Sequence, residues 1–250
     1  MKLKQIIFIG YCLLIFACGQ KQETEFIIDE DAIANTIQLL PDSIPNYEDM
    51  IAPLEHANIN YQAELMPEKI IMPENYEQIA LQTGILLADL SYLRYFNRVN
   101  LSMEYAAELE NRFLALDLPR DEILFAVEKI ERNLYASDSL LQILNQAYTS
   151  VTSDLIQAQR SALAGLIITG IWLESNRLML ADETVENESI RNAMLQTQCT
   201  EFKSLVPVLK AFENDKVRKL MRDIIECHCE NQELKVNTEF WVIQTMGEAW

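Results

Sequence analysis

The sequence predicts an all-α protein, a multi-helix bundle without a sheet. Its six glycines and seven prolines are few for 250 residues, and five of the prolines lie before residue 74. Apolar residues make up 50% of the chain, which is ample for a core, and after Pro73 they recur with the period of helices. The formal net charge of −18 would repel phosphates, so nucleic acid is a poor candidate partner.

The amino-terminal residues have the pattern of a signal peptide. Two lysines precede an apolar run from Ile6 to Ala17, which as a helix is too short to cross about 30 Å of hydrocarbon. The run ends in Leu14-Ile15-Phe16-Ala17-Cys18-Gly19, which resembles the lipobox of bacterial lipoproteins, where the chain is cut before the cysteine. We therefore expect residues 1–17 to be removed and Cys18 to be acylated. The alternative is an ordinary secreted protein with an incidental cysteine.

Acylation of Cys18 would anchor the chain in a membrane, because three acyl chains exceed the two signals that stable attachment needs. Gly19 stands in place of the aspartate that retains some lipoproteins in the inner membrane, which favours the outer membrane. Residues 18–28 are expected to form a polar tether, in which residues 20–25 resemble a weakened cell-surface export tag; a plain solvated tether is equally compatible. The periplasmic and cell-surface sides therefore both stay open. Cleavage removes two lysines and no acid, so the net charge of −18 becomes −20.

Two short motifs match the acceptor for O-glycans in Bacteroidota, Asp-Ser/Thr-aliphatic. They are Asp42-Ser43-Ile44 and Asp138-Ser139-Leu140, with Ser43 and Ser139 as the candidate acceptors. A three-residue pattern also arises by chance, so an unmodified serine is the alternative at each position.

Residues 29–73 are expected to form a short helix and a proline-rich wrap. From Asp29 to Leu40 the spacing places Ile33, Ile37 and Leu40 on one side of a helix. The prolines from residue 41 to residue 73 stop helices from propagating, so this stretch should be extended with at most short turns.

Residues 74–250 are expected to form the helical body. Proline suits the first turn of a helix, and serine or asparagine suits its cap, which sets the expected starts. The expected helices run from Pro73 to about Arg98, from Ser102 to Leu116, from Pro119 to about Tyr135, from Ser137 past Leu155 and from Arg160 to Ala181, with three more beginning near Asn187, Asn214 and Thr238. The helix from Arg160 is apolar around most of its circumference, which predicts burial on several sides.

A weak internal repeat divides the body into residues 74–158 and 160–235. The segment around Gly84 resembles the segment around Gly165, and each opens a long apolar helix. We expect these two helices to cross closely where the two glycines remove side chains, which would give two stacked pseudo-repeats of three to four helices. Chance similarity between two apolar helices is the alternative.

The same two segments carry a family resemblance. Gly84, followed by Asp89-Leu90-Ser91-Tyr92, and Gly170-Ile171-Trp172-Leu173-Glu174 resemble stretches expected in a group of uncharacterised all-helical lipoproteins of Bacteroidota. The resemblance covers roughly residues 74 to 235. It implies an all-helical fold and an envelope location, and it implies no activity.

Motifs of known chemistry are absent from the sequence. There is no glycine-rich phosphate loop, no Gly-x-Ser-x-Gly elbow and no His-Glu-x-x-His pair. His56 has no partner at a useful spacing, and His228 continues an apolar stripe. Cys227-His228-Cys229 would suggest zinc, but on a helix the two cysteines point about 200° apart, so we expect no metal and no cofactor. A disulfide from Cys199 to one of these cysteines stays open, with buried free thiols as the alternative.

Two acids stand out because they interrupt otherwise apolar helices. Asp89 and Glu174 must each reach water, an arginine or a hydrogen-bond donor, since an unpaired buried carboxylate is costly. Arg94, Arg98 and Arg177 are near in sequence, and Glu174 and Arg177 have the i, i+3 spacing of an ion pair. Either these acids make structural polar contacts, or they face a ligand pocket between the two central helices.

The function favoured by these patterns is binding. We expect a non-enzymatic, lipid-anchored protein of the outer membrane whose partner is an envelope protein or a small ligand. One alternative is an envelope enzyme that uses Asp89 and Glu174 as acid and base, which requires both in an open cleft. The other is a structural component of an envelope assembly, which predicts a broad exposed apolar patch.

Overall fold

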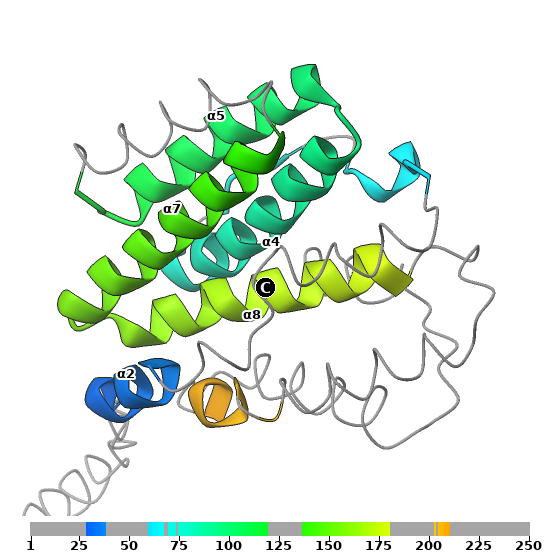
Figure 1. Ribbon diagram of the computed structural model, residues 1–250. Helices are drawn as coiled ribbons and strands as arrows, with labels where there is room; N and C mark the ends of the chain where they lie inside the picture. Colours follow the sequence, from blue (N-terminus) through cyan, green and yellow to red (C-terminus); the bar gives the residue numbers. More distant parts are fainter. Residues whose placement is uncertain are drawn as a thin grey trace, which may run out of the picture.

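The computed structural model describes residues 29–38, 60–67, 70–73, 75–119, 137–180, 203 and 205–210. These residues confirm the all-α prediction, because they form helices that pack on one another and contain no strand. In chain order the elements are α2 (Glu30–Gln38), the 3-10 helix η1 (Ala63–Leu65), α4 (Tyr76–Tyr95), α5 (Val99–Ala115), α7 (Ser137–Gln157) and α8 (Ser161–Leu180). Residues 205–210 form a further short helical stretch (Figure 1).

Helix α4 lies at the centre of the described bundle. It contacts α5, α7 and α8, so nearly all of its side chains from Ile79 to Arg94 are buried. Asn75 caps it, since its side-chain oxygen accepts a hydrogen bond from the backbone N–H of Gln78 at 2.8 Å. The prediction that Pro73 lies in the first turn is therefore wrong by three residues, because the chain becomes helical only after this cap.

Helices α4 and α8 cross in backbone contact. A Cβ atom built on Gly84 would lie 2.0 Å from the carbonyl oxygen of Ile167, and one built on Gly170 would lie 2.1 Å from that of Leu81. The predicted crossing of the two central helices is thus confirmed, but its partner glycine is wrong. Gly165 packs against Val208 instead. It lies five residues before Gly170, which on a helix turns it about 140° away from the crossing.

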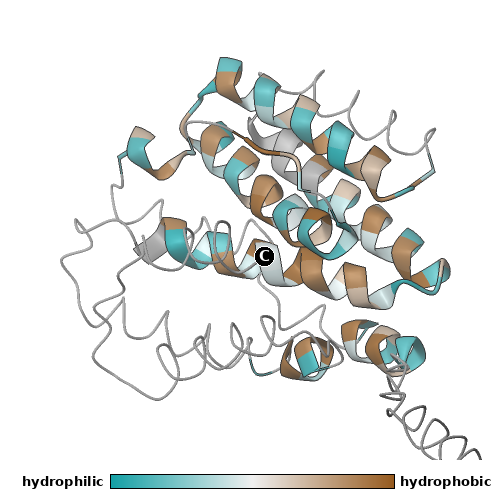
Figure 2. Cartoon of the chain, turned by 180° about the vertical axis from the view of Figure 1, so that it is seen from behind, coloured by the Kyte–Doolittle hydropathy of each residue, from teal (hydrophilic) through white to brown (hydrophobic). Residues whose placement is uncertain are grey.

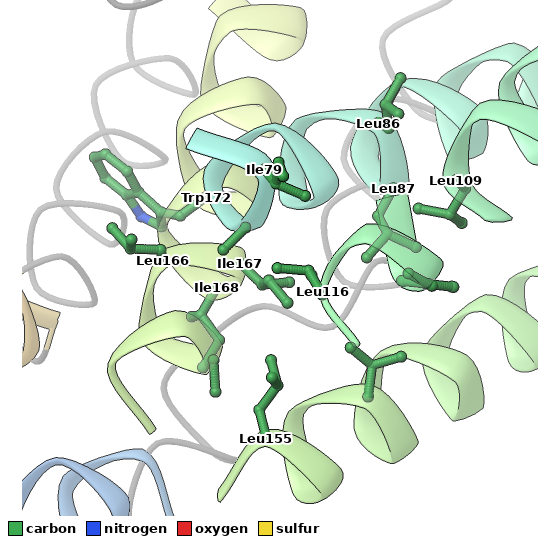
Figure 3. Close-up of a cluster of buried hydrophobic side chains, with 14 of the residues drawn as sticks. Ile79, Leu86, Leu87, Leu109, Leu116, Leu155, Leu166, Ile167, Ile168 and Trp172 are labelled. Carbon is green, nitrogen blue, oxygen red and sulfur yellow. The ribbon is translucent and has the colours of Figure 1, made fainter. Parts of the chain in front are cut away.

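The hydrophobic core surrounds this crossing. Figure 3 shows Ile79 and Ile167 close together, with Leu87, Leu109 and Leu116 beside them and Leu155 of α7 below. The amino-terminal half of α8 is mostly brown in Figure 2, in agreement with its prediction as a helix buried on several sides. Trp172, which the core encloses, is also fully buried.

The chain leaves three helices through left-handed residues that are not glycine. Asn97, Asp117 and Gln159 have φ angles of 55°, 54° and 58° and follow α4, α5 and α7. In each case the next N–H bonds back to the carbonyl of the third-last helical residue, as for Arg98 and Leu93 at 2.8 Å, which is a Schellman cap. These caps produce the tight turns that place α5 beside α4 and α8 beside α7.

The start of α5 differs from the prediction. Ser102 is not the cap of this helix but lies inside it, buried, and its hydroxyl donates to the carbonyl of Arg98 at 3.0 Å. The helix begins at Val99 because the turn after α4 already places Arg98 at the N-cap position.

The short amphipathic helix near residue 30 is confirmed as α2. Its Ile33 and Ile37 are buried, and it packs on α8. Glu30 adds a polar link, because its side-chain oxygen accepts a hydrogen bond from the backbone N–H of Ala162 in the first turn of α8 at 3.0 Å. A carboxylate at this position satisfies a free helix N–H and faces the positive end of the helix dipole.

Several predicted features lie outside the described residues. They are the signal peptide at 1–17, the tether at 18–28, Ser43, His56, the helix from Pro119, the helices from Asn187, Asn214 and Thr238, and the four residues Cys199, Cys227, His228 and Cys229. Most of the second predicted pseudo-repeat, 160–235, also lies outside the described residues. Within the described chain the repeat boundary coincides with the turn between α7 and α8.

Candidate functional site

The structure brings Asp89 and Glu174 together. Helices α4 and α8 leave their crossing toward the same end of the molecule (Figure 1), and these acids follow Gly84 and Gly170 by about one turn. The exposed fractions of Asp89 and Glu174 are 1% and 2%, so both carboxyl groups are sealed from solvent. That the two acids form a pair was a hypothesis from the sequence; that the pair is buried is shown by the structure.

Arg177 joins the two acids. Its Nε donates to both carboxylate oxygens of Glu174 at 2.9 Å, and its Nη2 also bonds to Glu174. The same Nη2 lies 4.0 Å from Oδ1 of Asp89. The predicted i, i+3 ion pair is confirmed, and Arg177 is the arginine near Asp89. We call these three residues the polar cluster.

An extended segment, residues 60–67, covers this end of the helices and is called the strap here. Nη2 of Arg177 donates to the backbone carbonyl of Leu65 at 2.6 Å, so a single nitrogen contacts both the strap and the acids. The hydroxyl of Tyr92 accepts from the backbone N–H of Gln62 at 3.0 Å. The strap is part of the predicted proline-rich wrap, and its one turn of 3-10 helix agrees with that prediction.

Aromatic contacts fasten the amino-terminal part of the strap. The ring of Tyr61 lies 5.9 Å from those of Tyr92 and Phe96, centroid to centroid. The guanidinium of Arg98 lies 4.1 Å from the Tyr61 ring centre, which is within cation–π range. Tyr61 therefore anchors the strap to the carboxyl-terminal end of α4.

The environment decides which of the two acids carries a proton. Burial raises the pKa of Asp89 well above its usual value, the charge of Glu174 and a hydrogen bond with it raise that pKa further, and Arg177 opposes the shift. This direction favours Asp89 as the protonated partner of the pair. Burial alone would lower the pKa of Arg177, but Glu174 and Asp89 raise it above its usual value.

The polar cluster is consequently neutral as a whole. With one proton on the acid pair, its single remaining negative charge balances the positive charge of Arg177. A buried ion pair is tolerated when its remaining atoms are hydrogen-bonded, and here the carboxylate of Glu174 and Nη2 of Arg177 have such partners.

Tyr105 of α5 completes the surroundings of the cluster. Its exposed fraction is 1%, and burial raises the pKa of its phenol far above the usual value, with a further contribution from the neighbouring acid pair. The hydroxyl of Tyr105 and Oδ1 of Asp89 are both buried and make no hydrogen bond to any residue that the structure describes. Two polar atoms without partners thus lie close to the Glu174–Arg177 ion pair.

Sequence reasoning found three of the participants and missed the others. Asp89 and Glu174 were visible as acids in apolar helices, and Arg177 was visible from its spacing. Tyr105 carried no signal, because it belongs to the buried stripe of an ordinary amphipathic helix. The strap carbonyl of Leu65 also carried none, since a backbone atom brought from 112 residues away leaves no mark in the sequence.

Arg94 is placed differently from the expectation that it could serve Asp89. Its exposed fraction is 1%, and its three guanidinium nitrogens make no hydrogen bond within the part of the chain that the structure describes. Burial lowers the pKa of Arg94, as expected for a desolvated cation. The structure therefore assigns the acids to Arg177 and not to Arg94.

The remaining candidates can be placed only in part. Ser139 falls in the first turn of α7, whereas Cys18 and Ser43 lie outside the described residues. Across the described ranges, no group of three histidine, cysteine, aspartate or glutamate residues could hold a metal ion. No helix of the described chain is long and apolar enough to cross a membrane.

Comparison with known proteins adds no relative. No protein-family model, no curated protein and no solved structure matches the chain.

Proposed function

We propose that this protein is a lipid-anchored helical protein of the bacterial outer membrane that acts by binding, and that Asp89 and Glu174 are structural acids. The observation that carries the second part is the closure of the polar cluster. Both carboxyl groups are buried, Glu174 is held by Arg177, and Arg177 is held by the strap. An acid–base pair that acts on a substrate needs access, which this arrangement does not give in its closed form.

The anchor is supported by the sequence around Cys18. A basic start, a short apolar run and a cysteine after Ala17 form one continuous pattern. Anchoring by acyl chains requires no membrane-spanning helix. The partner is proposed to be an envelope protein or a small ligand.

Replacement of the cysteine tests the anchor. Cys18→Ala should abolish acyl labelling and move the protein from the membrane to the soluble fraction after a carbonate wash. Cys199→Ala is the matched control, because it removes a cysteine of the mature chain and should leave labelling and fractionation unchanged. A Cys18→Ala protein that stays in the washed membranes would contradict the anchor.

Catalysis by the paired carboxyl groups is the second candidate. It is favoured by the adjacency of Asp89 and Glu174 and by the raised pKa of Asp89, since a proton-donating acid beside an ionised one is an arrangement found in enzymes. Crosslinking and capture from intact cells, performed with wild type, Asp89→Asn and Glu174→Gln, separates the candidates. A reproducible partner that the folded Asp89→Asn protein still captures supports binding and a structural acid. Loss of capture by a folded Asp89→Asn protein would place Asp89 in a ligand site.

A further inference from the structure

Among the described residues that contact the polar cluster, the strap is the segment that lies outside the long helices. Helices α4, α5 and α8 enclose the cluster with side chains that are themselves packed in the core. Within the strap only Met66 is buried, whereas Asn60, Ala63, Glu64 and Pro67 are exposed. Within the described residues, the strap is therefore the route by which water would reach the acids without unfolding a helix.

Few interactions hold the strap down. Among the described residues they are the hydrogen bond from Gln62 to Tyr92, the hydrogen bond from Arg177 to Leu65, and the packing of three strap residues. Tyr61 contacts aromatic rings and Arg98, Leu65 packs on the core, and Met66 is buried. A hydrogen bond exchanged for one with water contributes little net stability. Lifting the strap is therefore a local event that leaves the helix crossing intact.

With the strap in place, two buried polar atoms destabilise the protein, and lifting the strap would remove this unfavourable contribution. Among the described residues, Oδ1 of Asp89 and the hydroxyl of Tyr105 are buried without a hydrogen-bond partner. A buried polar atom without a partner is unfavourable compared with the same atom in water. Water admitted by an open strap would satisfy both atoms.

One atom couples the strap to the acids. Nη2 of Arg177 donates to the carbonyl of Leu65, contacts Glu174 and lies 4.0 Å from Oδ1 of Asp89. A negative charge on Asp89 would attract this nitrogen away from the Leu65 carbonyl, and it would also repel Glu174. We propose that the strap opens and closes over the polar cluster, and that opening is accompanied by release of the Asp89 proton.

The groups around Asp89 make it the residue that responds to pH. Glu174 and Arg177 face it from α8, Tyr105 faces it from α5, and Tyr61 of the strap acts on Tyr105. Arg177 and Tyr105 keep their protons throughout the neutral range, because the pKa of each is raised from an already high value. The acid pair thus supplies the proton, and within the pair Asp89 holds it.

The direction of the pH effect follows from the two environments. In the closed form the pKa of Asp89 is raised, and in the open form water returns it toward its usual value near 4. Between these two pKa values each pH unit should increase the population of the open form by up to tenfold. Below the pKa of Asp89 in the open form, the population of the open form is at its minimum and does not depend on pH. Above the pKa of Asp89 in the closed form, the population of the open form again no longer changes with pH. This proposal does not depend on the lipid anchor.

Hydrogen exchange of the full mature chain tests the proposal. The readout is the exchange rate of the Gln62 amide, which is protected in the closed strap by its hydrogen bond to the Tyr92 hydroxyl. The rate is measured from pH 5 to pH 8 and corrected for intrinsic exchange. Its protection should fall as pH rises in the wild type and should be independent of pH in Asp89→Asn. Asp117→Asn is the matched control, since Asp117 is an exposed acid at the end of α5, and it should keep the wild-type dependence.

A second variant keeps the test decisive if Asp89→Asn does not fold. Tyr92→Phe removes the acceptor for the Gln62 amide, so it should raise strap exchange about 2- to 10-fold at every pH and leave the pH dependence unchanged. Corrected strap exchange that does not change with pH in the wild type would overturn the proposal. So would an unchanged pH dependence in a folded Asp89→Asn protein.

Discussion

Substitution of Gly84 by alanine is the most severe single-methyl change that this fold predicts. The added Cβ would lie 2.0 Å from the carbonyl oxygen of Ile167 and 2.7 Å from the backbone nitrogen of Ile171. Ordinary contact begins near 3.4 Å, so α4 and α8 would have to separate by about 1 Å or more. No rotamer change relieves the clash, because the opposing atoms belong to a helix backbone.

The expected magnitude combines two opposing terms. A gap of about 1 Å forfeits up to half of the dispersion energy of the atom pairs across it, and overpacking of cores typically costs about 1–3 kcal/mol. Alanine in place of glycine returns about 1 kcal/mol of helix propensity. Since this clash is with rigid backbone at the centre of the core, we expect a net loss of about 3 kcal/mol in the free energy of unfolding. That corresponds to a melting temperature lower by about 6–12 °C.

Gly165 supplies a matched comparison. Its added Cβ would also meet an atom at 2.0 Å, but that atom is Cγ1 of the Val208 side chain. The clash of Gly165→Ala should therefore be relieved by Val208→Ala, so that the double variant is at least about 1 kcal/mol more stable than the sum of the single effects predicts. Urea unfolding of the four proteins measures this coupling. A harmless Gly84→Ala, or no coupling between Gly165 and Val208, would refute this account of the helix crossing.

Two further changes probe the ends of helices. Glu30→Ala should lower the free energy of unfolding by about 1 kcal/mol, because it removes the acceptor for the Ala162 N–H. Glu104→Ala, on the exposed face of α5, is the control and should change it little. Equal effects of the two substitutions in urea unfolding would contradict the role of Glu30 as a cap. Gln159→Gly should raise the free energy of unfolding by about 0.5–1 kcal/mol, and with it the melting temperature, because glycine adopts the φ of 58° without strain. A loss of stability would show that glutamine is not strained in this left-handed conformation.

The sequence predicted the helices well where their ends are marked by local chemistry. The expected helix from Arg160 to Ala181 matches α8, and the expected helix from Ser137 past Leu155 matches α7. The starts of α4 and α5 were misplaced because Asn75 and the left-handed turn at Asn97 decide them. A non-glycine residue in the left-handed conformation gives no signal comparable to glycine at that position.

The two acids of the candidate site could be predicted from the sequence, but the burial of the site under the strap could not. An acid inside an apolar helix demands a partner, and this argument identified Asp89 and Glu174. Which glycine lies at the crossing depends on the rotation of α8, and the similarity of the segments around Gly84 and Gly165 selected the wrong one. The strap could not be foreseen, because its contacts with Arg177 are made by a main-chain carbonyl.

The measurement that tests the central claim most directly is the stability of Asp89→Asn and Glu174→Gln as a function of pH. If Asp89 carries the proton, asparagine preserves its donor, and Asp89→Asn should be at least as stable as wild type at pH 7. Glu174→Gln leaves Arg177 without its counter-ion and should lose about 3 kcal/mol.

The pH dependence has a definite sign. Because the pKa of Asp89 is raised on folding, its proton contributes stability fully below the unfolded value of about 3.9, and this contribution is lost as pH rises toward the folded pKa. Relative to Asp89→Asn, the wild type should therefore lose stability from about pH 4 upward. A large loss in Asp89→Asn beside a mild effect of Glu174→Gln would contradict the assignment of proton and charge on which the account rests.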